Sequence, residues 1–215
     1  MSALLKQHFA TLLGGPLDWQ HRPAPETIPT GITEIDLPRG SLTEIYGPAS
    51  SGRTSLLLSI LAQATARQEA CALVDAEDSF HPASAAAAGV NLRRLLWVRC
   101  AHNAEQALQA ADLLVQGGGF GIVALDLGDT PPLTARRISL TSWFRLRRAV
   151  EHTPTVLVAV ARQANAKTCA SLAICCARER AAWSGTTRLL RGIRVRAAST
   201  QWSQACSPAF MARAI

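Results

Sequence analysis

The residues with the clearest chemical meaning form one glycine-containing loop: Gly47, Pro48, Ala49, Ser50, Ser51, Gly52, Arg53 and Thr54. A glycine, four residues, a second glycine, a cation and a serine or threonine make the pattern of a phosphate-binding loop. LTEIY precedes the loop and TSLLLSILAQATARQ follows it, so it would join a strand to a helix. The backbone N–H groups of residues 50 to 54 would then converge on a β-phosphate. We expect this loop, with Ser55, to bind ATP, and the Thr54 hydroxyl to contact Mg²⁺.

Arg53 departs from this pattern, because such loops carry lysine at that place. Lysine is a compact charge that fits between phosphate oxygens, whereas a guanidinium is planar and wider. Binding can persist, since arginine keeps the charge and the backbone amides supply much of the hold. Hydrolysis is more sensitive, because it depends on where charge is placed in the transition state. We therefore expect ATP binding with weak or no hydrolysis.

Acidic residues follow two other apolar runs. ALVDAEDSF places Asp75, Glu77 and Asp78 at the end of a strand that we expect next to the strand of the loop. A glutamate there could orient and deprotonate an attacking water, so Glu77 is the candidate catalytic residue. GIVALD ends in Asp126, where an acidic strand tip can coordinate Mg²⁺ through water. Either signal is weak alone, because strand-end acids often cap helices, but with the loop they form a set.

Apolar runs alternate with helical patterns from residue 28 onward. Strands that are apolar on both faces and separated by helices indicate a parallel sheet with helices on both sides. The expected strands are residues 42–46, 71–75, 95–98, 121–126 and 155–161, and the expected helices are residues 54–67, 82–88, 103–116 and 138–151. SLAICCARER and GIRVRAAST, which follow, are expected to add antiparallel edge strands. We predict an α/β fold with an N-terminal helix and linker (1–27), an ATP-binding core (28–200) and a tail (201–215).

Charge divides the chain into two unequal parts, although the net charge is +7. Residues 1 to 130 contain 8 Lys and Arg against 13 Asp and Glu, whereas residues 131 to 215 contain 14 against 2. So strong a surplus favours an acidic partner, most often nucleic acid, over a merely solvated face.

Other features narrow the class of protein. No apolar run approaches the roughly 20 residues of a membrane span, and Lys6 and His8 interrupt the stretch that a signal peptide would need. We therefore expect a cytoplasmic protein without a membrane partner. The 6 cysteines include no Cys-x-x-Cys pair, and we interpret them as small buried apolar residues.

Five segments between residues 30 and 163 resemble the RecA recombinases in order and spacing: TGITEID, EIYGPASSGRTSLLL, ALVDAEDSFHPASAAAAGVNLRRLLWV, AEQALQAADLLVQGGGFGIVALD and TVLVAVARQ. The second is the most specific. The resemblance implies a RecA-like P-loop NTPase fold with ATP and Mg²⁺ as cofactors. It implies that Glu77 matches the catalytic glutamate, Asp126 the Walker B aspartate, and Gln163 the glutamine that senses the γ-phosphate and couples it to DNA.

Departures from the family matter as much as matches. Arg53 replaces lysine, His81 stands where the family aspartate approaches the adenine, and ARQ stands where the family has Asn-Gln. Only about a dozen residues separate Asp126 from the helix near Ile138, where recombinases carry a longer segment with a DNA-binding loop. From this sequence we expect no counterpart of the family's large C-terminal domain. With RERAAWSGTTRLLRGIRVRA after the last core strand, the chain resembles the ImuA-like accessory proteins of SOS-type translesion mutagenesis.

The basic residues that would meet single-stranded DNA lie near the shortened loops. In the resembling family these loops line the filament axis, where DNA lies, and such contacts would be sequence-neutral and salt-dependent. On the helix near Ile138, Arg145 and Arg148 share a face, and Trp143 and Leu146 point elsewhere. The alternative for that helix is a solvated arginine edge. The candidate DNA contacts are Arg136, Arg137, Arg145, Arg148, Arg162 and Lys167.

Three functions remain open from the sequence. The first is an ATP-binding repair accessory that binds DNA, a specialised polymerase or RecA, with weak DNA-dependent ATPase activity at most. The second is an adaptor with a vestigial nucleotide site. The third, a small-molecule kinase, would need an acceptor pocket and an arginine-bearing lid, and residues 76 to 94 resemble the recombinase helix instead. The N-terminal helix would either bind a partner, including a second copy of the chain, or fold back on this domain.

Overall fold

A computed structural model describes residues 26–32, 35–183, 190–201, 205–206 and 209–213. The helix predicted near the N-terminus and most of its linker lie outside the described residues. Within the described part, no helix is long and apolar enough to cross a membrane. Five cysteines are free, and four of them are buried, as the sequence led us to expect, while Cys175 is half-buried: Cys71, Cys100, Cys169, Cys175 and Cys176.

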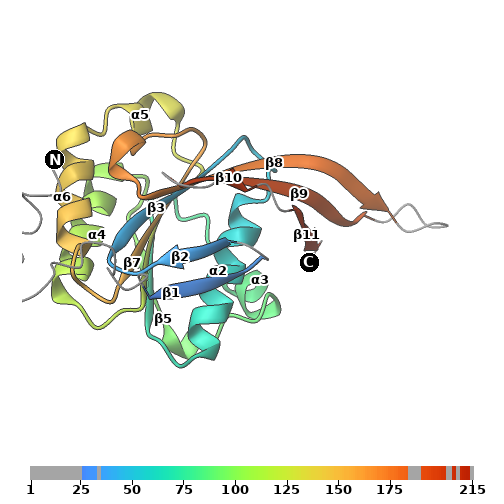
Figure 1. The fold of residues 1–215 in the computed structure, drawn as a ribbon, viewed down its shortest axis with the longest axis horizontal. Coiled ribbons are helices and arrows are strands. Elements are labelled where there is room, and N and C mark those ends of the chain that lie inside the picture. The colour runs from blue at the N-terminus through green and yellow to red at the C-terminus, as the bar shows by residue number, and fades with distance from the viewer. Residues whose placement is uncertain (1–25, 33–34, 184–189, 202–204, 207–208, 214–215) are drawn as a thin grey trace, which may run out of the picture.

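Parallel strands form the centre of a nine-stranded sheet (Figure 1). They lie side by side in the order β8, β3, β7, β6, β4, β5. Every residue of β4 and β7 is buried, which explains why their sequences are apolar throughout. Five parallel strands agree with the predicted ones to within one residue: β3 Ser41–Tyr46, β4 Cys71–Asp75, β5 Leu95–Arg99 at the sheet edge, β6 Ile122–Leu127 and β7 Val156–Ala161.

Helices cover both faces of this sheet, as predicted (Figure 1). One face packs against α2 (Arg53–Ala66), α3 (Pro82–Ala87) and a small hairpin of β1 (Thr27–Ile32) and β2 (Ile35–Pro38). The other face packs against α4 (Ala104–Gly117) and α6 (Leu140–Val150). The remaining helical segments are short: η1 Leu92–Arg94, α5 Pro132–Arg136 and η2 Lys167–Cys169.

Two details of the sheet differ from the expectation. The strand expected beside β3 was β4, but β7 and β6 lie between them. The predicted neighbour of β3 is wrong because the local sequence specifies each strand but not the distant strand with which it pairs. In addition, β8 (Leu172–Trp183) joins β3 in parallel, so the antiparallel part begins only with β9 (Leu190–Gln201). The segment after β6, expected as a loop, contains α5.

The C-terminal strands reach beyond the body of the protein as a long hairpin (Figure 1). β10 (Ala205–Cys206) and β11 (Ala209–Arg213) pair antiparallel with β9, so the tail region contributes strands to the sheet. Side chains alternate between buried and half-buried along β8 up to Cys176, and residues 177–180 are all exposed. We call residues 177–183 and 190–196 the arm.

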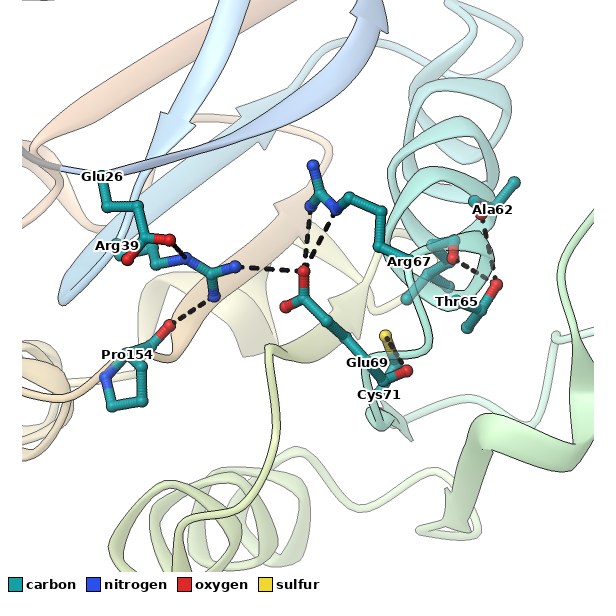
Figure 2. Close-up of polar contacts among 9 residues, drawn as sticks. Glu26, Arg39, Ala62, Thr65, Arg67, Glu69, Cys71 and Pro154 are labelled. Carbon is teal, nitrogen blue, oxygen red and sulfur yellow. Dashed lines mark hydrogen bonds and ion pairs between the residues drawn. The ribbon is translucent and has the colours of Figure 1, made fainter.

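The amino ends of the central strands are tied together by two arginines that share one carboxylate (Figure 2). Arg39 Nη2 donates to Glu69 Oε1 at 3.0 Å, and Arg67 Nε donates to the same oxygen at 3.2 Å. Arg39 Nη1 also donates to the carbonyl of Pro154 at 2.8 Å. We call Arg39, Arg67 and Glu69 the amino-end cluster, because it connects the segments that lead into β3, β4 and β7.

Candidate functional site

The phosphate loop joins β3 to α2 as predicted, and α2 begins at its cation. Gly52 caps the helix with a left-handed φ of 90°, and no side chain caps the first turn. A Cβ at Gly52 would lie 2.5 Å from Cγ2 of Val195, so the loop packs closely against β9. Ser51 is buried, and its hydroxyl has no hydrogen-bond partner among the described residues. The uncapped turn thus presents backbone N–H groups suited to an anion.

A pocket of about 200 Å³ opens beside this first turn. It lies at the carboxyl ends of the parallel strands, where open α/β sheets bind ligands. Its apolar side chains are Leu57 and Leu58 of α2 and Phe80 from the turn before α3, and the other lining side chains are polar or charged. The lining residues are Arg53, Thr54, Leu57, Leu58, Ser79, Phe80, His81, Ser84, Asp126, Gly128 and Asp129.

Arg53 lies in the pocket wall, with only 6% of the residue exposed. Its Nη1 donates to the carbonyl of Gly128 at 3.1 Å, and Nε of Arg162 donates to the same carbonyl at 3.2 Å. Burial lowers the pKa of Arg53, while the charge of Asp126 raises it. Two guanidinium groups therefore converge on one backbone oxygen beside the loop.

Asp126 reaches the same place from the tip of β6. Its Oδ1 accepts a hydrogen bond from the backbone N–H of Gly128 at 2.8 Å. Burial raises the pKa of Asp126 to about 6, against the partial opposition of that N–H group and of Arg53. The predicted Mg²⁺ ligands, Thr54 and Asp126, thus both line the pocket.

Glu77, the predicted catalytic residue, does not line the pocket. Its Oε2 lies 2.8 Å from Nδ1 of His102, in the turn that follows β5. His102 and the preceding Ala101 both have left-handed φ angles, of 64° and 48°, which the sequence did not signal. The structure therefore brings together the loop and Asp126 but turns Glu77 toward α4.

Asp75 is fully buried at the end of β4 and has a structural task. Its carboxylate accepts hydrogen bonds from the backbone N–H groups of Ser79 and Phe80 at 3.1 and 2.8 Å. It also accepts one from Trp97 Nε1 at 3.2 Å. These bonds fix the turn that places His81 at the N-terminus of α3, where its Nδ1 accepts from the backbone N–H of Ser84 at 3.2 Å.

Gln163, the predicted γ-phosphate sensor, is bonded to a predicted DNA contact instead of lining the pocket. Nε and Nη2 of Arg136 donate to Gln163 Oε1 at 3.1 and 2.6 Å. Arg136 ends α5 and Gln163 follows β7, so this pair connects the two shortened loops. Matching single residues to the family could not reveal that Arg136 and Gln163 pair with each other.

The other predicted DNA contacts are dispersed. Arg137, Arg148 and Lys167 are exposed. Nε of Arg145 lies 3.5 Å from Asp112 Oδ2 on α4, although the arginine side chain is 59% exposed. As predicted for α6, Trp143 and Leu146 are buried on the opposite face.

Glu44 is a buried residue whose role the sequence analysis missed. From β3, its Oε1 accepts hydrogen bonds from the backbone N–H groups of Asn165 and Ala166 at 2.6 and 3.0 Å. Burial raises the pKa of Glu44, and these two N–H groups oppose the shift. It holds the segment after β7 against the loop's own strand. The sequence did contain a signal for this role, because Glu44 is a charged residue within an otherwise largely apolar strand.

The sequence of the chain matches known proteins over the region just described. Residues 25–131 match the RecA N-terminal domain family. Over 108 residues, 47% of this chain and 31% of the relative, the chain is 45% identical to Protein RecA of Methylococcus capsulatus. It is 34% identical to Protein RecA of Chloroflexus aurantiacus over 158 residues, which are 64% of this chain and 45% of the relative.

The chain thus spans less than half the length of these relatives. Its matched region contains the phosphate loop, the turn after β4 and Asp126. The order of parallel strands, the helices on both faces and the antiparallel C-terminal strands fit a RecA-like fold. The chain belongs to the RecA-like family.

Proposed function

We propose that this chain is a RecA-like ATP-binding accessory factor of DNA repair, acting in translesion mutagenesis with weak or no ATP hydrolysis. The observation that carries the proposal is the pocket, in which an uncapped helix start, a buried arginine and a strand-tip carboxylate lie together with the apolar side chains of Leu57, Leu58 and Phe80. Helix-terminal N–H groups and arginine suit phosphates, and the apolar part suits a base. ATP is the ligand that combines these chemistries.

Weak hydrolysis is supported by the side chains around the pocket. Glu77 is engaged by His102, and Gln163 is engaged by Arg136. Both would have to change partners before they could act on a γ-phosphate or its attacking water. General base catalysis requires the base within hydrogen-bond reach of the proton that it removes.

The test is equilibrium binding of a fluorescent ATP analogue, followed by ATPase rates with and without single-stranded DNA. We expect measurable binding that Thr54→Arg abolishes, because a long side chain at this exposed position of the first turn would fill the phosphate site. Thr141→Arg, at the exposed second position of α6, is the matched control. Absence of binding by the unmodified chain would contradict the proposal.

A DNA-binding surface is the second element of the proposal. Arg137 and Arg148 are exposed near the α5–α6 segment, and the arm adds exposed arginines at 178, 180, 194 and 196. Within the arm, Glu179 lies 2.8 Å from Nε of Arg196 and 3.5 Å from Nε of Arg194. One carboxylate pairs with two of these four arginines, so a net positive charge remains for phosphates.

Fluorescence anisotropy with a single-stranded oligonucleotide tests this surface. The double variant Arg137→Glu/Arg148→Glu should bind more weakly and show a shallower dependence of affinity on salt, by about 0.7 in slope per lost phosphate contact. Arg93→Glu/Arg94→Glu, on η1, is the control, because it changes the net charge by the same amount. Equal losses in all variants would mean that no local DNA site exists here.

A non-catalytic adaptor is the second candidate function, and the pairing of Arg136 with Gln163 favours it. In that case a polymerase or recombinase partner would bind independently of nucleotide. Pull-down of purified candidate partners with and without ATP separates the two functions. Partner binding that ATP strengthens, and that Thr54→Arg makes insensitive to ATP, would contradict the adaptor.

A further inference from the structure

Four charged side chains surround the carbonyl of Gly128, and we call them the carboxyl-end cluster: Arg53, Asp126, Asp129 and Arg162. Both arginines donate to that carbonyl, at 3.1 and 3.2 Å. Nη2 of Arg162 also lies 3.6 Å from Asp129 Oδ1. Arg53 faces the charge of Asp126, which accepts the backbone N–H of Gly128. Two positive and two negative groups therefore balance around one turn.

These residues do not fit a divalent cation. Asp126 and Asp129 both line the pocket, but a guanidinium lies near each of them. Nη2 of Arg162 is 3.6 Å from Asp129 Oδ1, and Arg53 donates to the carbonyl of Gly128, whose N–H donates to Asp126. A dication beside Asp126 would be repelled by the buried Arg53, and such repulsion is strong where water is scarce. In typical nucleotide sites this carboxylate is free for the metal.

Arg53 is also equipped to meet phosphate oxygens directly. Among the described residues only its Nη1 has a hydrogen-bond partner, although a guanidinium carries five N–H donors. The residue is the first of α2, so its remaining donors accompany the backbone N–H groups of the first turn. A guanidinium binds phosphate by paired, charge-assisted hydrogen bonds and stays protonated at any physiological pH.

We propose that this chain binds a nucleoside triphosphate without a divalent cation, with Arg53 as the resident counter-charge that takes the metal's place beside Asp126. The inference rests on the proposed nucleotide site and adds its cation requirement. Asp126 is then a positioning residue that restrains Arg53, not a metal ligand. Arg162 contributes by sharing the Gly128 carbonyl and by engaging Asp129.

The experiment measures the dissociation constant of a fluorescent ATP analogue in excess Mg²⁺ and in excess EDTA. For the natural chain, we expect the two values to differ by less than about threefold. Tight binding in Mg²⁺ that weakens more than about tenfold in EDTA would overturn the inference and leave the proposed function intact. Absence of binding in both conditions would overturn both.

Two variants sharpen this result. Arg53→Lys should introduce a Mg²⁺ requirement of about tenfold or more, because a lysine is too compact to hold Gly128 and Asp126 together. Asp126→Asn should strengthen binding in EDTA, since it releases Arg53 toward the phosphates. If Asp126 were a metal ligand, Asp126→Asn would instead weaken binding in Mg²⁺ and leave binding in EDTA unchanged. Circular dichroism checks that the variants fold. If a variant does not fold, the comparison of the natural chain in Mg²⁺ and in EDTA decides the question.

Discussion

The two ends of the central sheet each hold a pair of arginines, and the two pairs are used differently. In the amino-end cluster, Arg39 and Arg67 donate to one carboxylate oxygen of Glu69. In the carboxyl-end cluster, Arg53 and Arg162 donate to one backbone carbonyl, and the carboxylates lie beside them. In the amino-end cluster the charges are paired with each other, and the pairing connects chain segments. The carboxyl-end cluster leaves guanidinium donors at a pocket, where a ligand can use them.

The largest expected effect comes from breaking the carboxyl-end cluster on one side only. Arg53→Met would remove the buried guanidinium that donates to the carbonyl of Gly128 and whose charge favours the ionised form of Asp126, and we expect a loss of about 3 kcal/mol in the free energy of unfolding. The double variant Arg53→Met/Asp126→Asn should recover most of that loss. Urea unfolding measures both. If the double variant is no more stable than the single one, the two residues are not coupled as described.

Gly52→Ala should have the next largest effect, because it attacks the contact between the phosphate loop and the C-terminal strands. The new methyl would meet Val195 at 2.5 Å from a backbone with φ of 90°. We expect a loss of about 2 to 3 kcal/mol in the free energy of unfolding. Gly89→Ala is the matched control, since its φ is 95° and its nearest neighbour, Ala62 Cβ, is 3.8 Å away. Equal losses in both variants would refute close packing at Gly52.

Glu69→Ala tests the other end of the sheet. Arg39 and Arg67 would lose their shared acceptor, and we expect a loss of about 1 to 2 kcal/mol in the free energy of unfolding. ATP affinity should stay unchanged, because the amino-end cluster lies at the opposite edge of the sheet from the pocket. A parallel fall in ATP affinity would break the distinction between a structural cluster and a functional one.

Glu44→Gln should give the smallest effect, and it depends on pH. Burial raises the pKa of Glu44 in the folded state, so folding favours the protonated form. The stabilising contribution is complete below the ordinary pKa and is lost as pH rises through the raised value. Glutamine keeps an oxygen acceptor for Asn165 and Ala166 without the charge. We expect the variant to gain stability relative to the natural chain as pH rises from 4 to 8, measured by unfolding at each pH.

Local sequence patterns predicted most of the fold because β3, β4, β6 and β7 are buried on both faces and because α4 and α6 are amphipathic. They did not predict strand order, since adjacency of β4 and β6 depends on pairing between distant segments. The phosphate loop and Asp126 were found from their spacing. The role of the Gly128 carbonyl was not predicted, because any residue has a backbone carbonyl and the sequence does not show which one will accept hydrogen bonds. The displacement of Glu77 depends on left-handed residues at Ala101 and His102, which no glycine announces.

Hydrogen–deuterium exchange with and without ATP tests the central claim most directly, namely that a triphosphate binds at the first turn of α2. We predict slower exchange in residues 47–58 and 79–84, which form the loop, the helix start and the facing pocket wall. Exchange in residues 36–40 and 67–70, around the amino-end cluster, should stay the same. Unchanged exchange at the loop under saturating ATP, or protection confined to the arm, would contradict the account.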